Sequence, residues 1–243
     1  MTGNKRKVEV CFTPALYPDF RNDEAVVVIV DILRATSAIV TAFMNGVNRI
    51  IPVATLEEAL VYKQKGYLVA AERDGIVRDF ADFGNSPYNF KREIIEGKDL
   101  VYSTTNGTYC IMLAKNSYRV LIGSYLNLDS LVNYIMQEDR DLILLCAGWK
   151  NKFNLEDSLF AGALAELVLQ HDRYTTHCDS VHASVDLWKL ARNDLMNYIE
   201  KAAQRHRLKK NNLDDVIGYC HTRNMTAVIP ALKSNYLTLV EHL

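Results

Sequence analysis

Charged side chains directly follow two apolar runs of this sequence, where a predicted strand ends. Asp31 follows the β-branched run 26–30, with Arg34 three residues later, and Glu72 and Arg73 follow a second apolar run. A carboxylate held at a strand end can bind a divalent cation, and a guanidinium group can form paired hydrogen bonds with a phosphate. These residue types therefore indicate a site for a phosphate group and a metal ion.

Hydroxyl, amide and acidic side chains follow three further apolar runs. These loops contain, in chain order, Thr104, Thr105, Asn106, Gly107 and Thr108, then Ser124 and Asn127, then Glu156 and Asp157. An ordinary turn would not need three threonines, so residues 104–108 favour an anion cradle in which Gly107 lets the backbone approach closely. Hard oxygen ligands suit Mg²⁺, which takes one or two carboxylates, several waters and often a substrate phosphate. Together the loops predict metal-assisted chemistry on a phosphorylated small molecule.

The charged residues also have structural interpretations. Asp31 could cap the following helix instead of binding Mg²⁺, and Arg34 could form a surface ion pair instead of binding phosphate. Glu72 could bind the metal ion, act as a general base or pair with Arg73. Asp157 has the spacing of a helix cap relative to the start of its predicted helix. The sequence leaves these alternatives open.

Several common phosphate and cofactor motifs do not occur. No two glycines are spaced as GxG and no GxxxxGK is present, so neither a dinucleotide-binding loop nor a P-loop is supported. Cys146 is followed six positions later by Lys152, where a cysteine phosphatase would need arginine, and a core thiol is the expected role. Leu33 occupies the position at which a phosphoaspartyl enzyme would favour a second carboxylate, although a covalent phosphoenzyme through Asp31 stays open.

Strands alternate with helices over much of the chain, which predicts how these loops are positioned. We expect strands at 8–12, 26–30, 49–53, 67–71, 100–103, 119–122 and 141–146, and a loop over 74–88. This alternation is typical of an α/β fold, and we predict a three-layer α/β/α arrangement with a mixed, largely parallel sheet. Because open α/β sheets bind ligands beyond the carboxyl ends of their strands, the polar loops should gather at one edge.

The last third of the chain has a different character. Residues 171–184 are polar, 185–208 predict one long amphipathic helix, and the tail from 213 predicts a helix followed by short strands near 227–229 and 236–240. The basic run 205–210 could bind an acidic partner, but a solvated helix end favoured by the dipole is the simpler interpretation. We expect a single domain over 1–243, with room for a helical C-terminal lobe from about 171.

Length and composition limit the class of protein. The chain has 243 residues, 49% of them hydrophobic, and a formal net charge of −1, so it can bury a sizeable core and has no global charge to attract nucleic acid. No apolar run is long enough to span a bilayer, and the basic N-terminus has no apolar segment after it. Five scattered cysteines favour reduced thiols. We expect a cytoplasmic protein without membrane partners, and a homo-oligomer stays open.

Six ordered motifs resemble those of the 2-phosphosulfolactate phosphatase family, often called ComB. They are residues 28–37 (VIVDILRATS), 71–75 (AERDG), 84–87 (GNSP), 104–108 (TTNGT), 123–127 (GSYLN), and 146–148 with 155–162 (CAG and LEDSLFAG). The motifs occur in the family's order and cover about residues 8–165, and weaker similarity continues through 219–220 and 228–230. The resemblance implies an enzyme that hydrolyses 2-phosphosulfolactate to sulfolactate and phosphate with Mg²⁺, a step of coenzyme M synthesis.

With this resemblance, the candidate residues receive expected roles. Catalysis is assigned to Asp31, Arg34 and Glu72, and Mg²⁺ binding to Asp31 with Glu72, Glu156 and Asp157. Substrate contacts are assigned to Arg34, Arg73, Asn85, Ser86, Thr104, Thr105, Asn106, Gly107, Thr108, Ser124 and Asn127. Two other functions remain: a phosphatase of another small phosphoester on the same scaffold, and a non-catalytic binder of phosphorylated or sulfonated metabolites.

Overall fold

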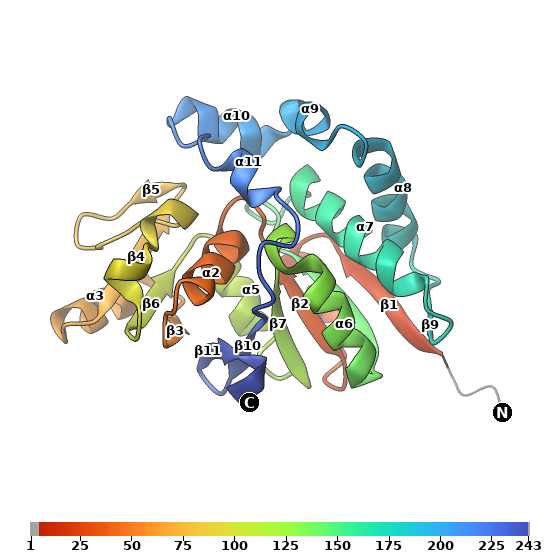
Figure 1. The fold of residues 1–243 in the computed structure, drawn as a ribbon, viewed down its shortest axis with the longest axis horizontal. Coiled ribbons are helices and arrows are strands. Elements are labelled where there is room, and N and C mark those ends of the chain that lie inside the picture. The colour runs from red at the N-terminus through yellow and green to blue at the C-terminus, as the bar shows by residue number, and fades with distance from the viewer. Residues whose placement is uncertain (1–4, 243) are drawn as a thin grey trace.

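Eleven strands form one mixed sheet in the computed structural model, which describes residues 5–242 (Figure 1). The order across the sheet is β5-β4-β6-β3-β11-β10-β7-β2-β8-β1-β9. The strands are β1 (Arg6–Cys11), β2 (Val26–Val30), β3 (Arg49–Pro52), β4 (Leu68–Arg73), β5 (Ile76–Val77), β6 (Asp99–Ser103), β7 (Arg119–Gly123), β8 (Leu142–Cys146), β9 (Tyr174–Thr175), β10 (Pro230–Lys233) and β11 (Tyr236–Leu239). The predicted α/β fold with a largely parallel sheet is confirmed.

Helices cover both faces of the sheet. They are α1 (Tyr17–Phe20), α2 (Ala35–Met44), α3 (Leu56–Gln64), α4 (Arg92–Ile95), α5 (Gly107–Leu113), α6 (Leu128–Glu138), α7 (Leu155–Leu169), α8 (Asp179–Ala191), α9 (Leu195–Tyr198), α10 (Ala203–Lys210) and α11 (Ile217–Cys220). Short 3₁₀ turns occupy η1 (Pro14–Leu16), η2 (Pro87–Asn89), η3 (Tyr125–Asn127), η4 (Ile199–Lys201) and η5 (Val240–His242).

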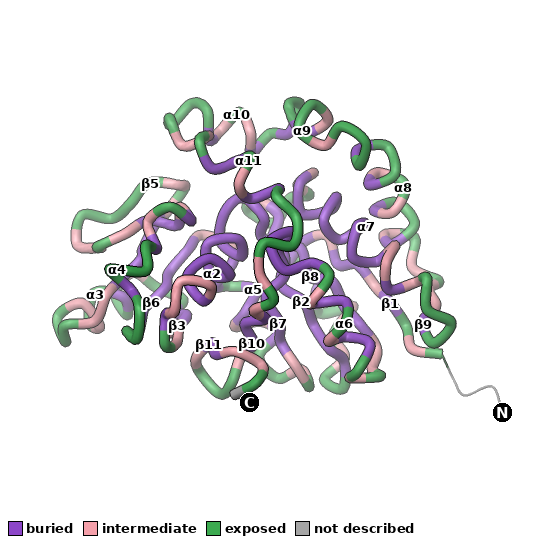
Figure 2. The backbone as a smooth tube through the Cα atoms, in the orientation of Figure 1, coloured by how far each residue is buried: buried purple, intermediate pink, exposed green. Residues whose placement is uncertain are grey.

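The central strand β2 explains why the sheet is buried on both faces. Its five residues are all buried, and it pairs in parallel with β7 on one side and β8 on the other. Val26, Val28 and Val30 belong to a core cluster with α6 and α7, whereas Val27 and Ile29 belong to a second cluster with α2 and α5. Side chains alternate across a strand, so an uninterrupted β-branched run fills both cores. Buried residues accordingly concentrate around this centre in Figure 2.

A C-terminal hairpin joins two largely parallel parts of the sheet. Strands β10 and β11 pair with each other in antiparallel fashion, and β10 also pairs with β7 while β11 pairs with β3. One side then contains β3, β6, β4 and β5, and the other contains β7, β2, β8, β1 and β9. The last strands of the chain therefore hold together parts of the sheet formed much earlier in the sequence.

The single long helix predicted over 185–208 is wrong. The structure has α8 from Asp179, then α9, η4 and α10, which arch over one edge of the sheet in Figure 1. Asp194 accepts a hydrogen bond from the backbone N–H of Asn197 at 3.4 Å and so begins a new helix. The amphipathic spacing continues across this break because α8 and α10 each bury one side, and Ile199 of η4 is buried between them.

Two smaller differences concern strands. The strand expected near 227–229 begins at Pro230 instead, which pairs with Leu239 of the hairpin, and the loop expected over 74–88 contains the short strand β5. No helix within residues 5–242 combines the length and apolar character needed to cross a bilayer. Part of the N-terminal stretch used in the sequence argument, residues 1–4, lies outside the described residues.

Candidate functional site

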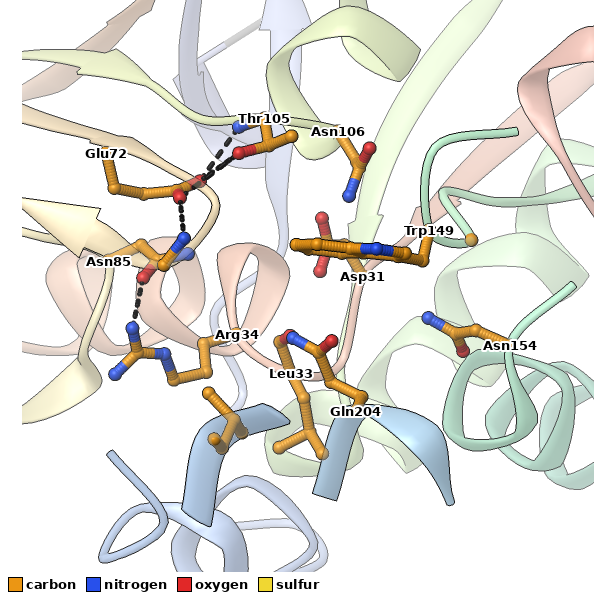
Figure 3. A pocket seen from close by; sticks show the side chains of 13 residues that line it. Asp31, Leu33, Arg34, Glu72, Asn85, Thr105, Asn106, Trp149, Asn154 and Gln204 are labelled. Carbon is orange, nitrogen blue, oxygen red and sulfur yellow. Dashed lines mark hydrogen bonds between the residues drawn. The ribbon is translucent and has the colours of Figure 1, made fainter. Parts of the chain in front are cut away.

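One pocket lies where the loops after β2, β4, β6 and β8 meet, and α10 covers it (Figure 3). Its lining consists of Asp31, Leu33, Arg34, Glu72, Gly75, Asn85, Thr105, Asn106, Gly148, Trp149, Asn154, Gln204 and Leu208. The free volume at its centre is about 20 Å³, which is enough for a water molecule or a metal ion but not for an organic substrate. We call it the carboxylate pocket.

Asp31 is the acidic side chain at the end of β2. It is 9% exposed, and the backbone N–H groups of Ala35 and Gly107 favour its ionised form and lower its pKa. A Cβ on Gly107 would lie 3.0 Å from Asp31 Oδ2 and 2.7 Å from the Ala35 side chain, so only glycine permits this approach. Burial, and secondly the nearby Glu72 carboxylate, raises the pKa of Asp31 to about 7.

Glu72 lies at the end of β4 and brings a second carboxylate to the pocket. One oxygen accepts the backbone N–H of Thr105 at 2.8 Å, the other accepts that of Gly75 at 2.6 Å, and the Thr105 hydroxyl lies 3.1 Å from both. These donors fix the position of the carboxylate.

Arg34 is a buried guanidinium in the same pocket, only 3% exposed. Its Nη2 donates to Asn85 Oδ1 at 2.7 Å, and burial lowers its pKa. Among the residues that the structure describes, no acidic side chain forms a salt bridge with it. A buried cation that is oriented by an amide but lacks an ion-pair partner is suited to bind an anion.

The second predicted arginine does not reach this pocket. Arg73 donates to the backbone oxygens of Glu72 and Ala54 and to the Ser103 hydroxyl, at 2.7, 3.1 and 3.0 Å. The side chain thus ties β4 to the neighbouring backbone and is absent from the pocket lining. The alternative that Arg73 pairs with the Glu72 carboxylate is not formed either, since the contact is with the Glu72 carbonyl.

The threonine loop divides into lining and supporting residues. Thr105 and Asn106 line the pocket, and Gly107 contacts Asp31. Thr104 and Thr108 instead bond to each other: each hydroxyl accepts the other's backbone N–H at 3.2 Å, and the Thr108 hydroxyl donates to the Thr104 carbonyl at 3.1 Å. Two of the three threonines therefore shape the start of α5 without lining the cavity.

Three more predicted substrate contacts lie outside the lining. Ser124 accepts the Leu126 N–H at 3.3 Å and lies 3.1 Å from the Ser37 hydroxyl, while Asn127 accepts the Ser124 N–H at 3.1 Å. Both are fully buried, and they cap the turn after β7. Ser86 precedes η2 and makes no side-chain cap. Of the residues from the 84–87 motif, Asn85 is the one that reaches the pocket.

The two acidic residues of α7 have different surroundings, and neither lines the carboxylate pocket. Asp157 accepts the N–H of Ile32 at 2.9 Å and that of Gly148 at 3.1 Å, one on each oxygen, and so connects the loops after β2 and β8. Burial, and secondly the charge of Asp31, raises its pKa well above the ordinary value. Glu156 is 1% exposed, and its carboxylate has no hydrogen-bond partner among the described residues.

Trp149 and Gln204 belong to the pocket but were not predicted from the sequence. The Trp149 ring crosses in front of Asp31 in Figure 3. Gln204 Nε2 donates to the Leu33 carbonyl at 3.0 Å, which fastens α10 over the strand-end loops. Trp149 lies in the loop after β8, three residues past the end of the strand, so the strand-end rule could have found it. Gln204 has no local signal, because its role depends on α10 folding back over the sheet.

The donor set fits Mg²⁺ at the carboxylate pocket. Two buried carboxylates, Asp31 and Glu72, share the lining with the Asn106 amide and the Thr105 hydroxyl, and Mg²⁺ favours one or two carboxylates completed by water and phosphate oxygens. Over residues 5–242, no cluster of three or more His, Cys, Asp or Glu residues suited to hold a metal ion occurs. A site of this kind would need water and substrate to complete the metal's coordination.

Comparison with known proteins gives a consistent family. Residues 11–235 match the family model described as 2-phosphosulpholactate phosphatase. A protein of Thermotoga maritima named probable 2-phosphosulfolactate phosphatase is 36% identical over 214 residues, which cover 88% of this chain and 92% of the relative. Proteins with the same name from Clostridium novyi and Clostridium perfringens are 32% and 31% identical over 84% and 89% of this chain, and 87% and 89% of their own lengths.

Proposed function

Because this chain belongs to the 2-phosphosulfolactate phosphatase family, which makes it a phosphoric monoester hydrolase, we propose that it hydrolyses 2-phosphosulfolactate to sulfolactate and phosphate with bound Mg²⁺. The observation that carries the proposal is the carboxylate pocket, in which Asp31 and Glu72 share one lining with the buried cation Arg34. A purely sensing protein would not need two buried carboxylates beside an anion-binding arginine. The proposed metabolic setting is a pathway of the coenzyme M type.

Asp31 and Glu72 are the residues that would hold Mg²⁺. Their two negative charges lie in a buried pocket where, without a cation, burial and mutual repulsion raise the pKa of Asp31. When bound, the metal ion would supply Lewis acidity to the phosphate and lower the pKa of a bound water. Glu156 and Asp157 are weaker candidates, because neither lines this pocket.

Arg34 would bind and orient the phosphate. Its guanidinium is held by Asn85 Oδ1, which leaves other N–H groups for phosphate oxygens, and it remains charged throughout the reaction. Fixed donors aimed at developing charge lower the barrier without reorganising during the reaction. The Thr105 hydroxyl and backbone N–H hold Glu72 in place, and Trp149 and α10 cover the pocket and limit access of bulk water.

The test is phosphate release from 2-phosphosulfolactate with Mg²⁺ or with EDTA, for the wild type and for Asp31→Asn, Glu72→Gln and Lys210→Gln. We expect activity only with Mg²⁺, a loss of about 100-fold or more in kcat for the first two variants, and none for Lys210→Gln, an exposed residue of α10 outside the pocket. If phosphate release in EDTA is as fast as with Mg²⁺, the proposed role of the metal ion is wrong. Faster release from 2-phospholactate than from 2-phosphosulfolactate would overturn the assigned substrate.

A further inference from the structure

A second and larger pocket adjoins the carboxylate pocket. Its free volume is about 300 Å³, and it lies between the loop preceding α7, the first turn of α7, and the segment from η4 to α10. Trp149, Asn154 and Gln204 line both pockets. The two spaces therefore share a wall, and a molecule held in the smaller one could extend into the larger.

The charge of this second pocket is positive. Lys152, Lys201 and Arg207 line it, and within the described residues none of the three forms a salt bridge with an acidic side chain. Glu156 is the acidic side chain of the lining, so three basic groups against one acidic group leave an excess of two positive charges. We call this space the basic pocket.

Arg207 is the most fixed of the three cations. Its guanidinium lies 4.3 Å from the centre of the Trp149 ring, and its Nε donates to Gln204 Oε1 at 2.7 Å. Gln204 in turn donates to the carbonyl of Leu33, the residue before Arg34. A chain of hydrogen bonds thus connects the cation of the basic pocket with the backbone that positions the cation of the carboxylate pocket. Two anion-binding groups held in this way suit a ligand with two acidic groups.

We propose that the basic pocket binds the sulfonate of the substrate, with Arg207 as the specificity-determining residue, while the phosphate lies against Arg34. This inference rests on the proposed function, since 2-phosphosulfolactate carries phosphate and sulfonate on adjacent carbons. A sulfonate is permanently ionised, and a guanidinium is weakly hydrated, planar and able to offer two N–H groups to its oxygens. Trp149, Phe153 and Ala202 form apolar walls of the pocket. A sulfonate and a guanidinium lose less hydration energy on entering such a place than a compact, strongly hydrated carboxylate would.

The test compares two substrates that differ only in the sulfonate. For Arg207→Gln, we expect kcat/KM to fall about 10- to 100-fold with 2-phosphosulfolactate, the usual range for one charge-assisted contact, and less than about threefold with 2-phospholactate. Arg207→Lys should recover part of the loss because it keeps the charge. Lys210→Gln removes one positive charge from the same helix outside either lining and should leave both substrates unaffected.

A merely structural role of Arg207 predicts a different result. If the side chain only supports Gln204 and Trp149, its loss should reduce turnover of both substrates equally, and that outcome would overturn the proposal. The double variant Lys152→Gln/Lys201→Gln provides a second test should Arg207→Gln fold poorly, because both lysines are exposed. It should also reduce the preference for the sulfonated substrate, and an unchanged preference would count against the proposal.

Binding of the product separates this proposal from the proposed reaction. Titration calorimetry with sulfolactate should show binding to the wild type that weakens about 10-fold or more in Arg207→Gln and is unchanged in Lys210→Gln. If sulfolactate binding depends on Arg207 but the wild type releases phosphate from neither substrate, the proposed reaction is refuted and the proposed sulfonate pocket is supported. If the wild type releases phosphate but Arg207→Gln binds sulfolactate as tightly as the wild type does, the sulfonate pocket is refuted and the proposed reaction is not.

Discussion

At the scale of single residues, the buried carboxylate of Asp31 marks the site because its burial lowers the stability of the folded protein. Asp31 has a pKa raised to about 7 mainly by burial. An ionised carboxylate in such a place is unfavourable for folding unless a cation accompanies it. A folded protein that retains this arrangement gives up stability, and the proposed binding of Mg²⁺ would offset that loss.

The pH dependence of stability follows from this pKa. In the unfolded chain Asp31 ionises near pH 4, whereas in the metal-free folded state it ionises near 7, so its contribution to stability decreases as the pH rises between these values. In EDTA, Asp31→Asn should therefore raise the melting temperature more at pH 8 than at pH 4. With Mg²⁺ at pH 8, the wild type should have the higher melting temperature of the two proteins, because only the wild type would bind the ion well. An equal shift at both pH values would contradict the raised pKa.

Asp157 offers a separate residue-scale prediction. Each of its carboxylate oxygens accepts one backbone N–H, from Ile32 and from Gly148, and an asparagine has only one acceptor oxygen. Asp157→Asn should lower the free energy of unfolding by about 1–3 kcal/mol, measured in urea. The exposed Asp172→Asn is the control and should change it little. If Asp157 positions the loops without binding metal, the Mg²⁺ concentration for half-maximal activity stays unchanged, and a large increase would identify it as a ligand.

At the scale of elements, close backbone packing positions the helices around the site. Gly162 in α7 faces α8, and a Cβ there would meet the carbonyl oxygen of Ser184 and lie 2.9 Å from Trp188 Cβ. Because Asp157 in the first turn of α7 bonds to the loops after β2 and β8, the contact of α7 with α8 helps to set where these loops lie. This close contact needs a glycine at that position.

Gly162→Ala should consequently destabilise the protein. Overpacking of this kind costs about 1–3 kcal/mol, which should appear as a lower midpoint in urea denaturation. Gly218→Ala is the matched control, since Gly218 is also helical and nothing lies within 4 Å of an added Cβ. The control should be neutral or slightly stabilising, because alanine is the better helix former. Equal effects of the two substitutions would show that the α7–α8 contact can relax.

We expect the helix α10 to move when substrate enters. The free volume of the carboxylate pocket, about 20 Å³, is too small for a phosphate ester, and Gln204 and Leu208 of α10 line it. We expect fast hydrogen exchange of the α10 amides in the free enzyme and slower exchange with Mg²⁺ and inorganic phosphate. Amides of β2 should exchange slowly under both conditions, as expected for a buried central strand. Unchanged exchange in α10 would indicate that access depends on another segment.

At the scale of the whole molecule, the two carboxylates come from different parts of the sheet. Asp31 follows β2 and Glu72 ends β4, and the hairpin of β10 and β11 lies between these parts. Distances across the pocket therefore depend on strands contributed by the last residues of the chain. The parallel pairs alone would not connect β3 to β7.

Leu237 tests the importance of this junction. It is fully buried in β11 and lies opposite Ile50 of β3, so Leu237→Ala should lower the free energy of unfolding by about 2–5 kcal/mol. Leu60→Ala, on the exposed side of α3, should change it by less than about 0.5 kcal/mol. In urea, phosphate release and helical circular dichroism should be lost together. Loss of structure in two separate steps would show that the two sides of the sheet fold independently.

The sequence by itself determined the α/β fold, the family, and the strand-end positions of Asp31 and Glu72. Local patterns carry this information, because a β-branched run forms a buried strand and the next residue must lie at its edge. The C-terminal helices were predicted less well, since the break at Asp194 depends on a single cap that does not interrupt the amphipathic spacing.

Only the tertiary structure decided which polar residues face the pocket. Arg73 and Thr104 lie at strand ends, as Glu72 and Thr105 do, yet both form hydrogen bonds with neighbouring backbone and lie outside the lining. Gln204 lines the site and bonds to Leu33, although the two residues are 171 positions apart in the sequence. A side chain's direction and its long-range partners depend on how separate elements pack, and no local pattern encodes that packing.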